Sequence, residues 1–151
     1  MKALFTFLIV VGGIALLQAQ DNPNYDKALA EKLGGDEYGM KKYVLAILKT
    51  GSNKTSDEKT TNELFRGHMD NIGRLVKEGK LIVAGPLGKN DKTYRGIFIF
   101  NVATIAEAQQ LVATDPAIKE KLLEVELFEW YGGAALPEYL KVQDKITLKG
   151  H

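Results

Sequence analysis

Residues 60–87, TTNELFRGHMDNIGRLVKEGKLIVAGPL, join a long amphipathic segment to a short apolar one. Apolar residues recur every three or four positions as far as Glu78, which is the period of an α-helix with one buried face. Thr60 and Glu63 have the spacing of a capping box, in which both side chains satisfy free N–H groups at a helix start. The pattern predicts a helix from Thr60 to Glu78, ended by Gly79.

Four apolar segments and a second helical one surround this helix. The expected strands are 41–50, 81–87, 94–102 and 122–131. A second capping box, Thr104 to Glu107, opens an expected helix that runs to about Ala113, and Asp115-Pro116 begins one more turn. The order βαβ then βαβ predicts a ferredoxin-like α+β fold, a four-stranded antiparallel sheet with both helices on one face. The alternatives are an unrelated α+β sandwich or two loosely packed units.

Residues 1–19 have the pattern of a signal peptide. Lys2 gives a positive start, an apolar run follows, and the small Ala19 stands where cleavage is expected. A membrane-spanning helix needs about 20 apolar residues, so an uncleaved anchor is the rival interpretation. We expect a secreted or periplasmic protein without membrane contact after cleavage. Its expected parts are an N-terminal extension with a short helix (20–40), one domain (41–131) and a C-terminal tail (132–151).

Composition narrows the classes of function. Lys plus Arg is 20 and Asp plus Glu is 19, so no nucleic-acid partner is expected, because phosphate binding needs clustered positive charge. The sequence has no Cys, which excludes disulfides and thiolate chemistry. His68 and His151 are its only histidines, so few imidazole ligands are available for a metal ion. No nucleotide-binding, zinc-protease or serine-hydrolase motif occurs, and we expect neither a metal nor another cofactor.

The expected strands are apolar on both faces, although helices would cover only one face of the sheet. In the first strand the two faces carry Tyr43, Leu45 and Ile47 on one side and Val44, Ala46 and Leu48 on the other. A second copy packed sheet against sheet is the economical cover, so we expect a homodimer. The alternative is that residues 24–33 and 136–148 fold over the open face.

His68 is the candidate for chemistry because it stands on the apolar stripe of the long helix. The stripe consists of Leu64, Phe65, His68, Met69, Ile72, Leu75 and Val76. An inward imidazole needs hydrogen-bond partners, and its chemistry suits acid–base work near neutral pH. The alternative is a core histidine that has no catalytic role. Asp115 also has two interpretations: an N-cap followed by Pro116 at the first helical position, or a carboxylate that orients His68.

The chain resembles the YciI-like (YCII-related) proteins in six blocks, which are HMDNI at 68–72, EGKL at 78–81, AGP at 84–86, RGIF at 95–98, TDP at 114–116 and EWY at 129–131. The resemblance covers about residues 41–131. It implies a dimeric α+β barrel and an active site built on His68 and Asp115. It also implies a small-molecule enzyme, since elimination or isomerisation of small cyclic compounds is associated with some relatives. Ala117 departs from the pattern, because many relatives have an aromatic residue there.

The remaining candidates concern ligand binding. Tyr43, Arg95 and Trp130 are expected to line a cleft, and Gly85-Pro86 lets a backbone approach a ligand. Aromatic strand residues belong more often to a core or an interface, which is the competing interpretation. Three hypotheses follow: a small-molecule enzyme with His68 as general acid or base, a non-catalytic binding module of the cell envelope, and a dimeric structural protein. We favour the first.

Overall fold

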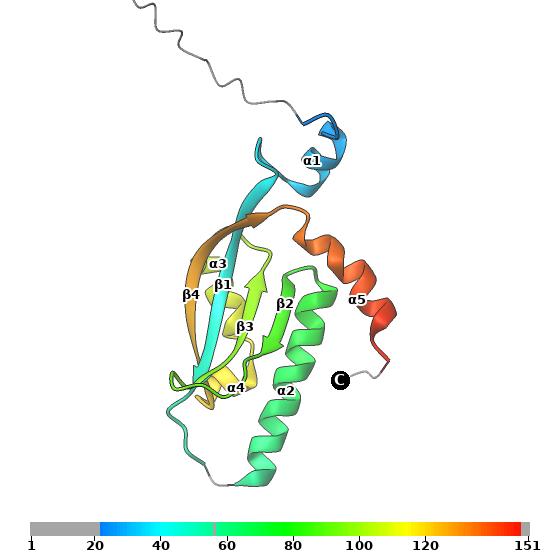
Figure 1. Ribbon diagram of the computed structural model, residues 1–151. Helices are drawn as coiled ribbons and strands as arrows, with labels where there is room; N and C mark the ends of the chain where they lie inside the picture. The colour runs from blue at the N-terminus through cyan, green and yellow to red at the C-terminus, as the bar shows by residue number, and fades with distance from the viewer. Residues whose placement is uncertain (1–21, 56, 149–151) are drawn as a thin grey trace, which may run out of the picture.

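The computed structural model describes residues 22–55 and 57–148 (Figure 1), and the expected signal peptide at 1–19 lies outside them. The elements are α1 (Lys27–Leu33), β1 (Met40–Thr50), α2 (Glu58–Lys77), β2 (Leu81–Pro86), β3 (Tyr94–Phe100), α3 (Ile105–Val112), α4 (Pro116–Lys119), β4 (Leu123–Gly133), the 3₁₀ helix η1 (Leu136–Tyr139) and α5 (Leu140–Ile146). Within the described ranges, no helix has the length and apolar character needed to cross a membrane.

The four strands form one antiparallel sheet in the order β2-β3-β1-β4. Central β1 pairs with β4 along its whole length, from Met40 opposite Gly133 to Thr50 opposite Leu123. This strand order is that of two interleaved βαβ units, which confirms the ferredoxin-like α+β fold predicted from the sequence. The second copy required by a dimeric barrel stays a prediction.

Helices α2, α3 and α4 pack against one face of this sheet. The core there is formed by Val44, Ala46 and Leu48 of β1, Phe98 and Phe100 of β3, Leu75 of α2, Ala108 and Val112 of α3, and Ala117 of α4. Alternate residues of each strand therefore point toward the helices, as the pleat requires. This packing places the apolar stripe of α2 against β3.

The start of α2 differs from the sequence prediction, whereas its end agrees. Asp57 caps the helix instead of Thr60, because its carboxylate accepts hydrogen bonds from the N–H groups of Lys59 and Thr60. The Thr60 hydroxyl also donates to this carboxylate, so Thr60 supports the cap from inside the first turn. Gly79, with φ of 67°, follows the helix in the left-handed conformation that glycine adopts without strain.

The other face of the sheet is open in the described part of the chain. Its apolar side chains include the half-buried Leu45, Ile47, Ile97 and Ile99, together with Phe128, which is 46% exposed, whereas Tyr43 at one end of this face is fully buried. Residues 136–148 do not cover it, since α5 lies beside α2 and Tyr139 donates to the carbonyl of Ile82 on the edge strand β2 at 2.7 Å (Figure 1). Helix α1 stands beyond the end of β1 and buries no residue. Among the described residues the part of this face around Phe128 therefore stays uncovered.

The segment between α1 and β1 is attached to the sheet through Asp36. Its carboxylate accepts hydrogen bonds from the N–H groups of Tyr38 and Met40, at 2.9 and 3.0 Å, and from the Tyr131 hydroxyl on β4. The Tyr131 bond is the main reason that the pKa of Asp36 lies below its ordinary value. The same bond raises the pKa of Tyr131 to about 12. A side chain of β4 thus anchors the extension.

Gly51 occupies the point where the end of β1 meets the start of β4. Its N–H donates to the Leu122 carbonyl at 2.9 Å, and a methyl group on it would lie 2.0 Å from the backbone oxygen of Lys121. Because that backbone atom cannot rotate away, we expect Gly51→Ala to lower the free energy of unfolding by about 1–3 kcal/mol or more. Urea unfolding followed by circular dichroism measures this.

Gly73 on α2 provides the matched control, since an added methyl group there meets nothing within 4 Å. Gly73→Ala should leave the stability unchanged or raise it by up to about 1 kcal/mol, because alanine favours the helix. Equal unfolding midpoints for the two variants would contradict the packing described at Gly51.

Candidate active site

His68 points from α2 into the helix-side core, as its position on the apolar stripe predicts. The residue is 8% exposed. Its ring stacks on Phe98 of β3, with centroids 5.8 Å apart and planes inclined by 25°. Phe65, one turn earlier, meets the ring edge-on at 6.1 Å. Two aromatic side chains therefore hold the plane of the imidazole.

Asp115 is 1% exposed and combines the two roles that the sequence left open. Its Oδ1 accepts hydrogen bonds from the N–H groups of Ala117, at 2.9 Å, and Ile118, at 3.4 Å, so it caps α4. Its Oδ2 lies 2.6 Å from Nδ1 of His68. One oxygen thus belongs to the cap, and the other is free to bind the imidazole.

The contact determines which nitrogen of His68 is available for chemistry. An ionised carboxylate only accepts hydrogen bonds, so Nδ1 of His68 must donate to Asp115. In the neutral ring, Nε2 then carries the lone pair. Among the described residues Nε2 has no partner, and no fully buried side-chain nitrogen or oxygen lacks one, so solvent reaches Nε2 although the residue as a whole is buried. The arrangement is a base with its orienting carboxylate.

Gly67 explains how α2 and α4 come close enough for this contact. A methyl group on Gly67 would lie 2.9 Å from Cγ of Pro116, closer than real Cβ contacts allow. Gly67 and Pro116 are the chain neighbours of His68 and Asp115, so their close packing brings the imidazole and the carboxylate together. Gly67 was not among the predicted site residues, although a glycine inside a long helix is a signal of close packing.

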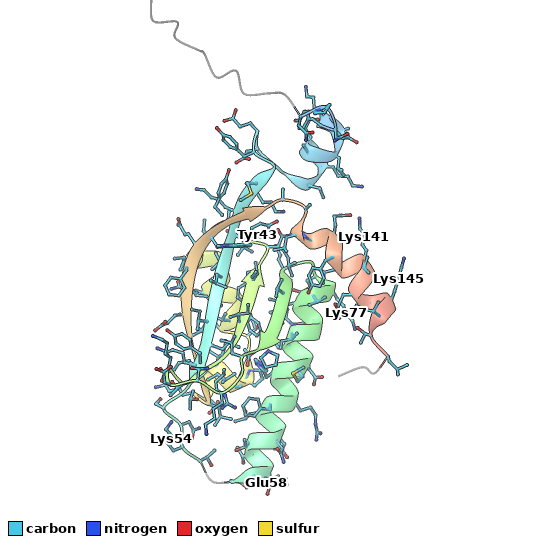
Figure 2. All side chains as sticks on the ribbon, viewed as in Figure 1. Tyr43, Lys54, Glu58, Lys77, Lys141 and Lys145 are labelled. Atoms are coloured by element: carbon cyan, nitrogen blue, oxygen red, sulfur yellow. The ribbon has the colours of Figure 1, made fainter. Side chains whose placement is uncertain are left out.

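Tyr43 and Trp130 do not join the His68–Asp115 pair. Their rings lie 5.5 Å apart on neighbouring strands, and the Tyr43 hydroxyl donates to the Gly133 carbonyl at 2.9 Å. Figure 2 labels Tyr43 at the end of the sheet where β4 leads into η1. Tyr43 alternates with core residues of β1, so it faces the side of the sheet opposite the pair. Burial raises the pKa of Tyr43.

Arg95, Gly85 and Pro86 lie where β2 and β3 pair. Arg95 is exposed at a step where the register of β3 against β1 shifts. Gly85 and Pro86 pair with Ile97 and Gly96. None of the three contacts His68 or Asp115 through a hydrogen bond in the described residues. The proposed ligand-binding role of these residues and of Tyr43 and Trp130 stays a prediction.

A hollow of about 1220 Å³ lies between α2, β2 and the η1–α5 segment. Its walls include Ile72 and Val76 of α2 and Tyr139 of η1, but neither His68 nor Asp115. In the described ranges no three His, Asp or Glu side chains are grouped so that they could hold a metal ion. The buried polar or charged side chains of the described residues are His68, Asn71 and Asp115, so the His68–Asp115 pair combines burial with acid–base groups.

Comparison with known proteins identifies the family. Residues 43–131 match the family model described as YCII-related domain, which is more than half of the chain. The chain belongs to the YCII-related family. This confirms the resemblance seen in the six sequence blocks, and it places both His68 and Asp115 inside the YCII-related domain.

One solved structure similar to this YCII-related protein is described as 5-chloro-2-hydroxyhydroquinone dehydrochlorinase (TftG) from Burkholderia phenoliruptrix AC1100, in complex with 2,5-dihydroxybenzoquinone. The two are 20% identical, and the match covers 58% of this chain and 92% of that chain with a TM-score of 0.41. No curated protein matches the chain.

Proposed function

We propose that this YCII-related protein is a small-molecule enzyme in which Nε2 of His68 exchanges a proton with the substrate. The observation that supports the proposal is the 2.6 Å contact between Nδ1 of His68 and Oδ2 of Asp115, both buried. A core histidine without chemistry would satisfy its polar atoms internally. Here only Nδ1 is satisfied in the described residues, and the other nitrogen remains available.

The pair suits reactions in which one group takes a proton and later returns it. In an elimination, Nε2 removes a proton from the carbon next to the one that carries the leaving group. The electron pair of that C–H bond forms the double bond, the bond between carbon and the leaving group breaks, and the leaving group takes the electron pair of that bond. In an isomerisation, the same nitrogen returns the proton to another atom. In both, the carboxylate of Asp115 stabilises the imidazolium that forms.

The test is conversion of small cyclic compounds that carry an acidic C–H next to a leaving group or a double bond. Wild-type protein and the His68→Gln variant are incubated with each compound, and the products are followed by NMR. Conversion by the wild type that the variant lacks supports the proposal. Equal conversion by both contradicts it. A compound that shifts the melting temperature of both proteins equally, without conversion, favours the binding-module hypothesis.

The open sheet face supports a second proposal, that two copies of the chain pack sheet against sheet. Its apolar residues come from β1, β3 and β4, and the terminal segments lie elsewhere. We expect the wild type to be a dimer at micromolar concentration. Phe128→Asp should weaken the dimer at least about tenfold, because a buried unpaired carboxylate is costly. Sedimentation equilibrium measures the mass.

Val142→Asp is the matched control for the dimer. Val142 is 58% exposed on α5, which is not part of the open sheet face, so the same change of apolar to acidic side chain should leave the dimer intact. A wild-type chain that sediments as a monomer at these concentrations would contradict the proposal.

A further inference from the structure

A hydrogen-bonded cluster of Asn71, Arg74 and Thr114 lies beside the His68–Asp115 pair. Arg74 Nη2 donates to Asn71 Oδ1 at 2.7 Å and to Thr114 Oγ1 at 2.9 Å. Thr114 Oγ1 and Asn71 Oδ1 are 2.9 Å apart. Asn71 is 8% exposed, so its amide, which belongs to the cluster, is buried. The cluster ties α2 to the turn that precedes α4.

We propose that this cluster is a positioning device that sets the distance between His68 and Asp115. Thr114 directly precedes Asp115, and Asn71 follows His68 by three positions on the same face of α2. The cluster and the pair therefore connect the same two segments at neighbouring levels of the helix. Holding Thr114 against α2 restricts where the carboxylate of Asp115 can stand.

The number of donor protons limits which hydrogen bonds this cluster can form. Thr114 has a single hydroxyl proton, which goes either to Asn71 Oδ1 or to the Leu111 carbonyl at 2.6 Å. In both cases the Thr114 oxygen still accepts from Arg74, whose charge strengthens the bond. Glu78 fixes the other guanidinium nitrogen through contacts of 2.8 and 3.0 Å. The Arg74 side chain is thus held at both ends of its fork.

Gly67 holds the same turn from the other side. Asp115 is preceded by Thr114, which is hydrogen-bonded to α2, and followed by Pro116, which packs on Gly67. With both neighbours fixed, the backbone of Asp115 cannot retreat from α2 without breaking one of these contacts. The 2.6 Å contact is therefore imposed by the surrounding structure and does not depend only on the attraction between the two side chains.

The inference rests on the proposed function for its kinetic consequence, but the geometry is measurable without a substrate. The chain has two histidines, so the His68→Gln variant assigns their imidazole signals in ¹H–¹⁵N NMR. In the wild type we expect a proton on Nδ1 of His68, protected from water. Thr114→Val keeps the side-chain shape and removes the hydroxyl. It should speed exchange of that proton about tenfold, the loss of roughly one hydrogen bond.

Three further variants complete the test. Thr114→Ser restores the hydroxyl and should restore slow exchange. Arg74→Met replaces a side chain that is 44% exposed, so we expect it to fold even if Thr114→Val does not, and it should also speed exchange. Thr50→Val removes a hydroxyl at the end of β1, 3.4 Å from the Thr93 carbonyl, and should have no effect.

If the Nδ1 proton of His68 exchanges at the wild-type rate in both Thr114→Val and Arg74→Met, the positioning role is overturned, whatever the turnover of these variants. With a converted compound in hand, Thr114→Val should lower kcat about tenfold with KM unchanged, because the proposal gives Thr114 a positioning role and no contact with the substrate. If His68→Gln retains full turnover while the exchange effects stand, the proposed function fails and the positioning inference survives.

Discussion

Replacing His68 with Gln is expected to lower kcat/KM by about 10²–10⁴-fold, the usual contribution of a positioned acid–base group. The Gln side chain carries an amide N–H that can donate to Asp115, so the buried carboxylate keeps a partner and the fold is retained. The amide has no group that takes up a proton at neutral pH. The loss should therefore appear in kcat and not in the melting temperature.

The measurement compares kcat and KM of the wild type and the variant for a compound that the wild type converts. His151→Gln, at the other histidine of the chain, is the matched control and should keep full turnover. A well-folded His68→Gln protein with undiminished kcat/KM would remove the acid–base role from His68. The pair would then be structural.

Replacing Asp115 with Asn should separate the two roles of this side chain. The Asn carbonyl oxygen still accepts from the Ala117 N–H, so the cap of α4 is kept. The Asn amide donates, which forces Nδ1 of His68 to accept and places the ring proton on Nε2. Nε2, the nitrogen that we propose takes up the proton, is then no longer a base. We expect kcat to fall by about 10²–10⁴-fold with a small change in stability.

Asp115→Ala, in contrast, removes the cap and leaves His68 without its partner. The lost cap costs about 0.5–2 kcal/mol, and the unsatisfied imidazole costs about 1–3 kcal/mol more. Urea unfolding should therefore show a clear loss of stability for Asp115→Ala and little loss for Asp115→Asn. Both variants should lose turnover. Equal loss of stability in the two variants would mean that the cap and the pair are not separable in this way.

The order and type of the main elements could be read from local patterns. The helical period of α2 and the capping box at Thr104 are properties of a few consecutive residues, and both are present in the structure. The start of α2 was wrong by a few residues because Asp57 and Thr60 are both good caps and only the path of the preceding loop decides between them. The tail after β4, for which no element was predicted, forms η1 and α5, and the Tyr139 hydroxyl of η1 holds it to the Ile82 carbonyl of β2.

The predicted ligand-binding residues show what local sequence patterns do not determine. Alternation along β1 separates Tyr43 from Val44, but it does not say which of the two faces the helices cover. That choice depends on how the crossover connections pack, and it places Tyr43 and Trp130 away from His68.

The amino-acid order by itself determined that His68 turns inward and that Asp115 begins a helical turn, because side-chain direction follows from the local period of the backbone. Their meeting across 47 positions was decided by the tertiary structure alone. It requires α2 and α4 to approach until Gly67 touches Pro116, and the bonds of Thr114 to α2 to close the other side. Such an approach arises from packing between segments distant in sequence, which no local pattern contains.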